Sequence, residues 1–364
     1  MIHLNRGRPC YKQYYYAMRK VLHIDCDCFF AAVEMRENPQ LCHVPIAIGG
    51  HSDRRGVIST CNYPARKFGI HSAMATAQAL KKCPQLILLP GNMSLYREVS
   101  NQVMSIIRRY GIAYEQVSVD EAYLELDPDD SAIDIGNKIR AEVEAEVGIT
   151  VSVGAAPNKF LAKVASDWNK PNGLFAVKPH KVGAFVAQLE VRKIPGIGPK
   201  TAERLSDRGI TLCSDAQSYS LLELVNLFGR TGASLYKRCR GQDDRPLSTG
   251  RVRKSISVEH TFADDIFLAE QLNDEVEVLW QKFLQRTEKA NIDSRSLAPF
   301  VKVKFNDFSQ TTLADHLQVT SLEAFRQLLQ QARLRQDADE TQGVRLIGIG
   351  GRCSEIDEQQ LVLF

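Results

Sequence analysis

The sequence predicts an α/β fold with more than one domain, and three observations support this prediction. Strand patterns alternate with helix patterns from Val21 to about Ala155, which is typical of a layered α/β domain. The composition changes at Ile194, where a glycine-rich hairpin opens a helical region, and strands return beyond Gly250. The chain has 364 residues, of which 44% are hydrophobic, so it is long enough to form more than one core.

Acidic residues interrupt two predicted strands where apolar residues are expected. Asp25 and Asp27 end an apolar run that begins at Val21, and Asp120 and Glu121 lie together far downstream. Because alternate residues of a strand share a face, two such strands side by side bring three or four carboxylates together. Clustered carboxylates repel one another and need a cation, and hard oxygen ligands favour Mg²⁺ or Mn²⁺.

A simpler interpretation is that these acids cap helices or carry ordinary charge at strand ends. It suits Asp27 well, because residues 28–34 look like a helix that Asp27 would N-cap. It suits Asp25, Asp120 and Glu121 less well, because a break in an apolar pattern usually marks a site. We therefore predict metal ligands at these three positions.

Composition limits the class of protein. A net charge of +3 gives no global field for nucleic acid, so any basic surface must be local. The nine cysteines include no CxxC pair, and several stand in apolar contexts as reduced thiols do, which suggests a reducing cytoplasm. No apolar run is long enough to span a bilayer. Residues 1–17 show neither pattern nor core, so we interpret Met18 as the natural start.

The remaining elements of the α/β region follow from periodicity. The patterns predict strands at 44–50, 57–60 and 150–155, and helices at 75–82, 93–110, about 133–147 and 159–168. Acids at strand ends place the site at the sheet edge.

Two basic segments of this region suit phosphate groups. Tyr63, Arg66 and Lys67 form one patch at a turn or helix start, and a guanidinium beside a phenol hydroxyl suits phosphate oxygens. Lys170 stands in the Pro/Gly turn 169–173. A solvated basic turn and a surface lysine are the competing interpretations, and the residues alone leave both open.

The glycine-rich hairpin at 194–205 has the spacing of a helix-hairpin-helix. Its turn includes Gly196 and Gly198, and Lys200 lies in the first turn of the following helix. Backbone N–H groups at such a turn bind a phosphate without reading sequence. An ordinary tight turn between helices is the alternative, and residues 228–232 repeat the pattern less clearly.

Residues 241–250 are typical of a linker, and basic strands are predicted beyond it. The strand period places Arg251 with Arg253, and Lys302 with Lys304, on one sheet face while the valines face the core. A solvated face and a face that binds a nucleic-acid backbone fit this alternation about equally. The final segment, 359–364, suits either a last core strand or a peptide that inserts into a pocket of a partner.

Taken together, five motifs resemble the Y-family of translesion DNA polymerases, most closely its bacterial DinB-type members. The resemblance covers Met18 to Phe364, with the motifs in order and at the expected separations. The motifs are Asp25–Glu34, Arg55–Thr60, Asn62–Arg66, Ser118–Tyr123 and Asn169–Gly173.

The resemblance implies a right-hand polymerase with a ferredoxin-like palm, small fingers, a helical thumb and an α/β little finger. The implied division is a leader at 1–17, palm at 18–28 and 84–177, fingers at 29–83, thumb at 178–243, linker at 244–254, little finger at 255–356 and a clamp-binding tail at 357–364.

The resemblance also assigns roles to residues. It implies two Mg²⁺ ions, with Mn²⁺ as an alternative, held by Asp25, the Cys26 carbonyl, Asp120 and Glu121, and Glu121 is the expected catalytic residue. Phe30 corresponds to a steric gate against ribonucleotides. The remaining implied contacts are the triphosphate (Phe29, Tyr63, Arg66, Lys170), DNA (Gly196, Gly198, Lys200, Arg251, Arg253, Lys302, Lys304) and a sliding clamp (Gln360, Leu361, Leu363, Phe364).

The expected function is therefore template-directed DNA synthesis of low fidelity, without proofreading, in damage tolerance. The expected partners are primer-template DNA, deoxyribonucleoside triphosphates and the sliding clamp, and the expected state is a bacterial cytoplasmic monomer. A nucleotidyl cyclase or metal nuclease also uses carboxylate pairs but leaves the helix-hairpin-helix and the gate unexplained. A DNA-binding scaffold does not need the acids.

Overall fold

The computed structural model describes residues 19–250, 252–315, 319–335 and 342–353. It divides into two compact units, one built mainly from residues up to Thr249 and the other from residues 50–58, 74–81 and those from Gly250 onward. Among the described residues, no helix is long and apolar enough to cross a membrane.

A five-stranded sheet forms the centre of the first unit, with the order β5-β6-β1-β7-β8. All neighbouring strands are antiparallel except β7 and β8. The strands are β1 (Val21–Cys26), β5 (Ala113–Gln116), β6 (Glu121–Glu125), β7 (Val151–Ala156) and β8 (Leu174–Ala176). The two acid-bearing segments of the sequence are therefore neighbours in this sheet, as predicted.

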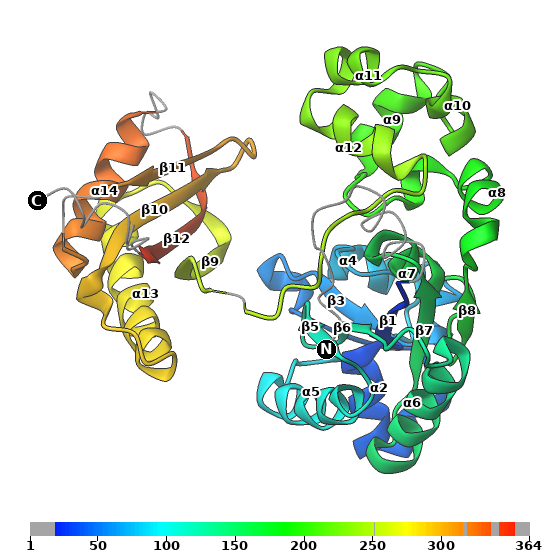
Figure 1. The fold of residues 1–364 in the computed structure, drawn as a ribbon. Coiled ribbons are helices and arrows are strands. Elements are labelled where there is room, and N and C mark those ends of the chain that lie inside the picture. Colours follow the sequence, from blue (N-terminus) through cyan, green and yellow to red (C-terminus); the bar gives the residue numbers. More distant parts are fainter. Residues whose placement is uncertain (1–18, 251, 316–318, 336–341, 354–364) are drawn as a thin grey trace, which may run out of the picture. The chain divides into compact units, whose positions relative to one another are not determined.

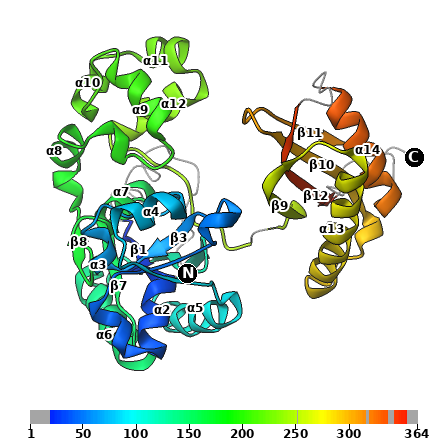
Figure 2. The same cartoon turned by 180° about the vertical axis from the view of Figure 1, so that it is seen from behind.

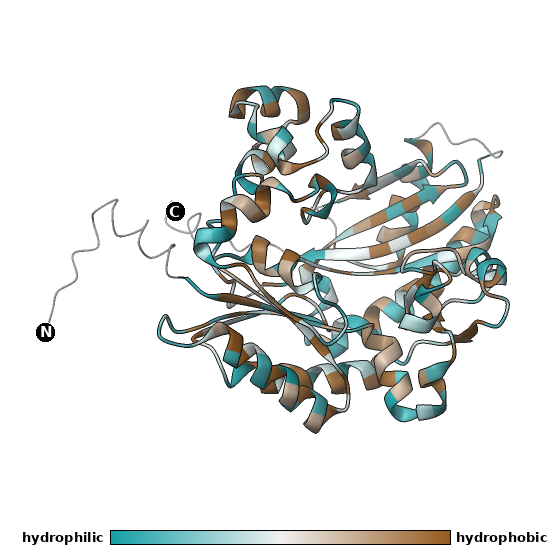
Figure 3. Cartoon of the chain, turned by 90° about the vertical axis from the view of Figure 1, so that its right-hand side faces the viewer, coloured by the Kyte–Doolittle hydropathy of each residue, from teal (hydrophilic) through white to brown (hydrophobic). Residues whose placement is uncertain are grey.

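Alternation along β1 decides what each face of the sheet contacts. Leu22 and Ile24 belong to a core that includes residues of α2 (Phe29–Glu37), α5 (Met93–Arg108) and α6 (Ala132–Val147). Val21 belongs to a second core with α7 (Lys159–Ser166) and the helices that follow. Figure 1 and the reverse view in Figure 2 show these helices around the sheet. In Figure 3 the helices carry both hydrophobic and polar residues, as such packing requires.

A smaller sheet, with the order β3-β2-β4, precedes α5 in the chain. Its strands are β2 (Ile46–Gly49), β3 (Ile58–Cys61) and β4 (Ile87–Leu89), and its helices are α3 (Tyr63–Arg66) and α4 (Thr76–Lys82). Strands β4, β5 and β8 are additional to the prediction, because three or four residues show little periodicity. The short 3₁₀ helices are Pro39–His43, Ser52–Arg54, Pro179–Lys181, Val191–Lys193 and Ser294–Ser296.

The helical region contains the predicted hairpin. Gly196 has a φ of +94°, and Gly198 is the N-cap of α9 with a proline at its first turn. At the second glycine pair, a Cβ on Gly232 would overlap the Leu224 carbonyl oxygen, so this glycine permits close helix packing. The helices are α8 (Val182–Ala187), α9 (Pro199–Ser206), α10 (Cys213–Gln217), α11 (Leu221–Phe228) and α12 (Arg230–Arg238), and Figure 1 shows α9 to α12 gathered together.

Much of the segment interpreted as a linker is packed against the first unit. Asp243 is buried, accepts the Phe160 N–H at 3.0 Å and forms an ion pair with Arg245 at 2.8 Å. Further along, the Ser248 N–H donates to Glu115 Oε2 at 2.6 Å. Residues 241–248 thus form no helix or strand, but Asp243 and Ser248 are anchored to residues distant in sequence, which the linker interpretation did not anticipate.

The second unit contains a four-stranded antiparallel sheet with the order β11-β10-β12-β9. Its elements are β9 (Ser255–Ile266), α13 (Ala269–Lys289), β10 (Leu297–Phe305), β11 (Gln310–Ala314), α14 (Leu322–Leu334) and β12 (Val344–Cys353). Val301 and Val303 are buried in a core with residues of α13 and α14, so the alternation predicted for β10 is confirmed. Lys302 and Lys304 occupy the intervening positions.

The basic strand predicted at 251–254 is wrong for its described part. Residues 252–254 have no strand structure, Val252 is 83% exposed, and β9 begins at Ser255. A single alternation of basic and apolar residues was too short to identify a strand. Arg251, the leader 1–17 and the tail residues Gln360, Leu361, Leu363 and Phe364 lie outside the described residues.

Candidate active site

Strand register brings two of the predicted acids together. Asp25 of β1 lies directly opposite Glu121 of β6 in an antiparallel pair, so their side chains share a face of the sheet. The Cys26 N–H donates to the Asp120 carbonyl oxygen at 3.0 Å, which holds the ends of the two strands together. This register matters because a slip of one residue would turn the side chains of the shifted strand to the opposite face of the sheet.

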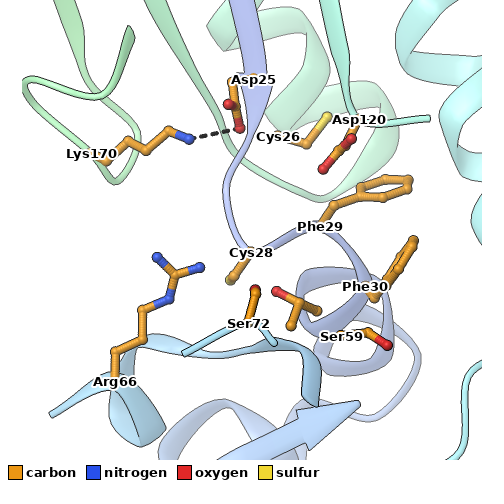
Figure 4. Close-up of a pocket in the computed structure, with 11 residues that line it drawn as sticks. Asp25, Cys26, Cys28, Phe29, Phe30, Ser59, Arg66, Ser72, Asp120 and Lys170 are labelled. Carbon is orange, nitrogen blue, oxygen red and sulfur yellow. Dashed lines mark ion pairs between the residues drawn. The ribbon is translucent and has the colours of Figure 1, made fainter. Parts of the chain in front are cut away.

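A cavity of about 170 Å³ opens beside these strand ends (Figure 4). Seven residues assigned by resemblance line it: Asp25, Cys26, Phe29, Phe30, Arg66, Asp120 and Lys170. Cys28, Ser59, Thr60 and Ser72 also line it. In Figure 4, Lys170 and Arg66 extend toward the cavity from different segments of the chain. The sequence motifs therefore converge on one site, whereas Tyr63 and Glu121 are not in its lining.

Lys170 neutralises Asp25. Its Nζ lies 2.7 Å from Asp25 Oδ1 and 3.1 Å from Asp167 Oδ1. Burial raises the pKa of Asp25 to about 7, although the Lys170 ammonium opposes that rise. Burial alone lowers the pKa of Lys170, but the Asp25 and Asp167 carboxylates bring it above its ordinary value. The pair is thus a closely spaced cation and anion at the cavity wall.

Glu121 is held on the side of the sheet that α7 covers. His23 Nε2 lies 3.8 Å from Glu121 Oε2, and Lys163 Nζ lies 2.6 Å from Glu121 Oε1. Both neighbours lower the pKa of Glu121. His23 is fully buried and its Nδ1 lies 2.8 Å from Ser166 Oγ. Sequence reasoning missed His23, although the two-residue period of β1 already places it on the Asp25 face.

The acids fit a hard divalent cation by chemistry, although each has its own partner in this structure. Asp120 hydrogen bonds the Ser118 hydroxyl, while Asp25 and Glu121 pair with lysines. Among the described residues, no three His, Cys, Asp or Glu side chains are grouped so as to hold a metal. Carboxylate and carbonyl oxygens on adjacent strand ends are nevertheless the donors that Mg²⁺ prefers.

Asp27 does not cap a helix, contrary to the sequence interpretation. The N-cap of α2 is Cys28, which has a φ of +43° and no side-chain cap. Asp27 is instead buried, and it accepts hydrogen bonds from Thr150 Oγ1 at 2.8 Å, Ser152 Oγ at 2.8 Å and the Asn172 N–H at 2.7 Å. Partners in β7 and in the Lys170 turn outcompete the local cap.

The helix start at Tyr63 supplies the second cationic segment. Asn62 caps α3 by accepting the Ala65 N–H at 3.0 Å, and its side chain also accepts the Ile46 N–H at 3.1 Å. The Arg66 guanidinium lies 5.0 Å from the Tyr63 ring centroid. Burial raises the pKa of Tyr63 to about 12, and its hydroxyl has no hydrogen-bond partner among the described residues. A buried hydroxyl of this kind suits a ligand that accepts a hydrogen bond.

Phe30 forms a rigid wall of the cavity. Its ring stacks on Tyr96 with centroids 4.4 Å apart and an interplanar angle of 17°. The Tyr96 hydroxyl in turn donates to Glu34 Oε1 at 2.6 Å, which fixes the supporting ring. Phe29 precedes it and is buried in the core.

Three family models match the chain. The impB/mucB/samB family covers residues 24–167, the DNA polymerase-iota thumb domain covers 192–243, and the impB/mucB/samB C-terminal domain covers 253–361. DNA polymerase IV of Shewanella oneidensis is 47% identical over 358 residues, which is 95% of this chain and 99% of that protein. DNA polymerase IV of Shewanella baltica is 49% identical over 336 residues, or 91% of this chain and 93% of that one.

Solved structures agree with these relatives. A Y-family DNA polymerase chimera of Dbh and Dpo4 is 28% identical, covers 93% of this chain and 100% of its own, and has a TM-score of 0.82. An insertion ternary complex of Dbh DNA polymerase is 27% identical, covers 92% and 98%, and has a TM-score of 0.63. The fold class expected from the sequence, with its right-hand architecture, is thereby confirmed.

Proposed function

This chain belongs to the Y-family of DNA polymerases, in its DinB-type DNA polymerase IV group, and we propose that the cavity beside Asp25 and Asp120 is its active site. The protein is a DNA-directed DNA polymerase that works in translesion synthesis. The observation that carries the site assignment is the convergence of strand-end carboxylates, two cations and an aromatic wall on one cavity.

The family depends on divalent metal, and we propose two Mg²⁺ ions with Mn²⁺ as a substitute. Asp25, the Cys26 carbonyl, Asp120 and Glu121 would hold them. When bound, such ions neutralise phosphate charge and lower the pKa of the primer 3′-hydroxyl. The chain's own contribution is to hold the carboxylates on two strands of fixed register, with Glu121 oriented by Lys163.

Lys170, Arg66 and Tyr63 would bind the incoming triphosphate, with Phe29 beneath it. Lys170 exchanges its contact with Asp25 for a phosphate oxygen, since an ammonium pairs with either anion. The Tyr63 hydroxyl, which has no partner among the described residues, donates to another phosphate oxygen. Lys170 and Arg66 already line the cavity, and Tyr63 lies in the same helix as Arg66, α3.

Phe30 would exclude ribonucleotides by contact with the sugar. A pocket without a wall rejects an added hydroxyl only about 10²-fold, so the Tyr96-supported ring is required for stronger selection. Phe30→Ala should therefore increase the incorporation of ribonucleotides relative to deoxyribonucleotides by about tenfold or more in single-nucleotide insertion. Unchanged sugar selectivity would refute this assignment.

The expected division is into palm, fingers, thumb, linker, little finger and tail, with nucleotide selection at the one cavity described above. DNA would contact the backbone at Gly196 and Gly198, then Lys200, and in the second unit Lys302 and Lys304, with Arg251 and Arg253 before β9. The clamp-binding tail, the monomeric state and the bacterial cytoplasm complete the proposal.

Primer extension on a defined template with Mg²⁺ tests the site. Asp120→Asn should abolish extension while DNA binding, measured by fluorescence anisotropy, persists. Asp129→Asn provides a matched control, because Asp129 is exposed beyond β6. Extension by Asp120→Asn at the wild-type rate would exclude this cavity as the active site.

A further inference from the structure

The turn that presents Lys170 is held by residues outside the cavity lining. Asn172, two positions after Lys170, has a φ of +48°, a left-handed conformation that asparagine adopts more readily than most residues other than glycine. Contacts on both sides of the turn hold it in this conformation. On one side of the turn, the Asn172 N–H donates to Asp27 Oδ2 at 2.7 Å.

On the other side, Arg140 of α6 holds the same residue through its guanidinium. Arg140 Nε donates to Asn172 Oδ1 at 3.2 Å, and Nη2 donates to the same oxygen at 2.9 Å. Nη2 also donates to the Asn172 carbonyl oxygen. The guanidinium itself is oriented by Asn137 one turn earlier, whose Oδ1 accepts from Nη1 at 3.0 Å. Backbone and side chain of Asn172 are thus clamped together.

The residues after the clamp are fixed by strand β7. The Val153 N–H donates to the Gly173 carbonyl oxygen at 2.8 Å, and the Gly173 N–H donates to Ser152 Oγ at 3.3 Å. A Cβ on Gly173 would overlap the Asn169 carbonyl oxygen, so the turn closes tightly on itself. The C-terminal end of the turn is therefore fixed by β7. Arg140 restrains the preceding part of the turn, which carries Lys170.

We propose that Arg140 is a positioning residue for nucleotide binding, which sets the place of Lys170 through Asn172 and thereby the affinity for the incoming triphosphate. This inference rests on the proposed role of Lys170 as a triphosphate ligand. Arg140 is not in the cavity lining, so its effect is indirect. A flexible lysine gains affinity when its backbone is already in the binding position, because less freedom is lost on binding.

The test compares Arg140→Ala and Arg140→Lys with wild type. The dissociation constant of a deoxyribonucleoside triphosphate is measured on a complex with a dideoxy-terminated primer, and kcat and KM are measured in steady state. Arg140→Ala should raise the dissociation constant and KM about three- to tenfold, as expected for lost charged hydrogen bonds, with a smaller change in kcat. Arg140→Lys should restore little of the affinity, since a lysine ammonium cannot reproduce the several fixed donors of a planar guanidinium.

Arg109→Ala is the matched control. Arg109 also binds α6, through Glu142 at 3.3 Å and Glu146 at 3.2 Å, but it makes no contact with Asn172 among the described residues. Its removal should leave triphosphate affinity unchanged. Thermal melting and DNA affinity, both expected to stay near wild type for Arg140→Lys, distinguish a lost restraint from general unfolding.

Lys170→Ala completes a double-mutant cycle. If Arg140 acts through Lys170, Arg140→Ala should cause little further loss of triphosphate affinity in the Lys170→Ala background. The inference would be overturned if Arg140→Ala left triphosphate affinity unchanged. It would also be overturned if Arg140→Ala lowered that affinity by the same factor in the wild-type and Lys170→Ala backgrounds. A Lys170→Ala variant with wild-type affinity would instead refute the proposed role of Lys170, and the single variant alone reveals that failure.

Discussion

The ion pairs beside the sheets of the two units differ in how far they are exposed to solvent. In the first unit, Arg19 and Glu125 form an ion pair at 2.7 Å whose side chains are 3% and 11% exposed. In the second unit, Lys302 and Glu259 pair at 3.0 Å with exposures of 28% and 39%. A buried pair that loses one partner leaves a charge unsolvated, whereas an exposed pair separates at little cost. We therefore expect the Arg19–Glu125 pair to fix local geometry and the Lys302–Glu259 pair to be free to exchange its partner.

Removing one carboxylate from each sheet should give the largest contrast. Glu125→Gln leaves the Arg19 charge buried and should lower the free energy of unfolding by about 3 kcal/mol, while the matched Glu259→Gln should change it by less than about 1 kcal/mol. Urea denaturation checks this with one fluorescent reporter for each unit: Trp168 in a Trp280→Phe background for Glu125→Gln, and Trp280 in a Trp168→Phe background for Glu259→Gln. Equal effects for the two variants would contradict the comparison.

Acid should weaken the first unit through Asp243. Although burial raises it, hydrogen bonds from Arg245 and Arg238 bring the pKa of Asp243 down to about 2 from an ordinary 3.8. A lowered folded pKa means that the stabilisation is complete above about pH 4 and is lost as pH falls toward 2. The difference in stability between wild type and Asp243→Asn should shrink over that range in urea titrations. A difference that stays constant down to pH 2 would exclude this origin.

The behaviour of Asp243 and Asp27 also shows where sequence reasoning stops. Local pattern predicted the acidic strands and placed Asp25 at a strand end, because hydrophobic alternation is a local property. It assigned Asp27 to a helix cap and Asp243 to the border of a linker, because their true partners are distant in sequence. The sequence around an acid shows its possible local hydrogen-bond partners, but not the distant partners that the tertiary fold supplies.

Prediction of the site residues met the same limit between local pattern and tertiary contact. Asp25, Asp120, Phe30 and Lys170 were identifiable as parts of recognisable motifs, and the structure brings them to one cavity. Arg140 belongs to none of those motifs, since its only signal is a basic residue on a helix surface. Residues that position a site through a neighbouring turn are found only once the turn is seen.

Lys304 tests the binding role of the second sheet. Its ammonium lies 4.9 Å from the centroid of the exposed Phe308 ring, and it forms no ion pair with any described residue. Lys304→Ala should lower DNA affinity about threefold at low salt and reduce the slope of log K against log salt by about one, as for one lost phosphate contact. Anisotropy titrations at several salt concentrations measure both. An unchanged slope would show that Lys304 does not contact a phosphate.

Glu259→Gln should have the smallest effect on DNA affinity, and it should raise the affinity that Lys304→Ala lowers. Lys302, Gly348 and Glu259 occupy one row across β10, β12 and β9. A Cβ on Gly348 would lie 2.8 Å from Glu259 Cγ, so the glycine leaves space for the carboxylate to reach Lys302 across the central strand. We expect this carboxylate to compete with DNA phosphates for Lys302.

Glu259→Gln should therefore raise DNA affinity about two- to threefold at low salt, and the gain should fade as salt screens the charge. Glu270→Gln makes the same change of charge on α13, which packs with the other face of the sheet, and should leave affinity nearly unchanged. Equal gains from both variants would show that only total charge matters. A gain confined to Glu259→Gln would establish that this exposed pair restrains DNA binding.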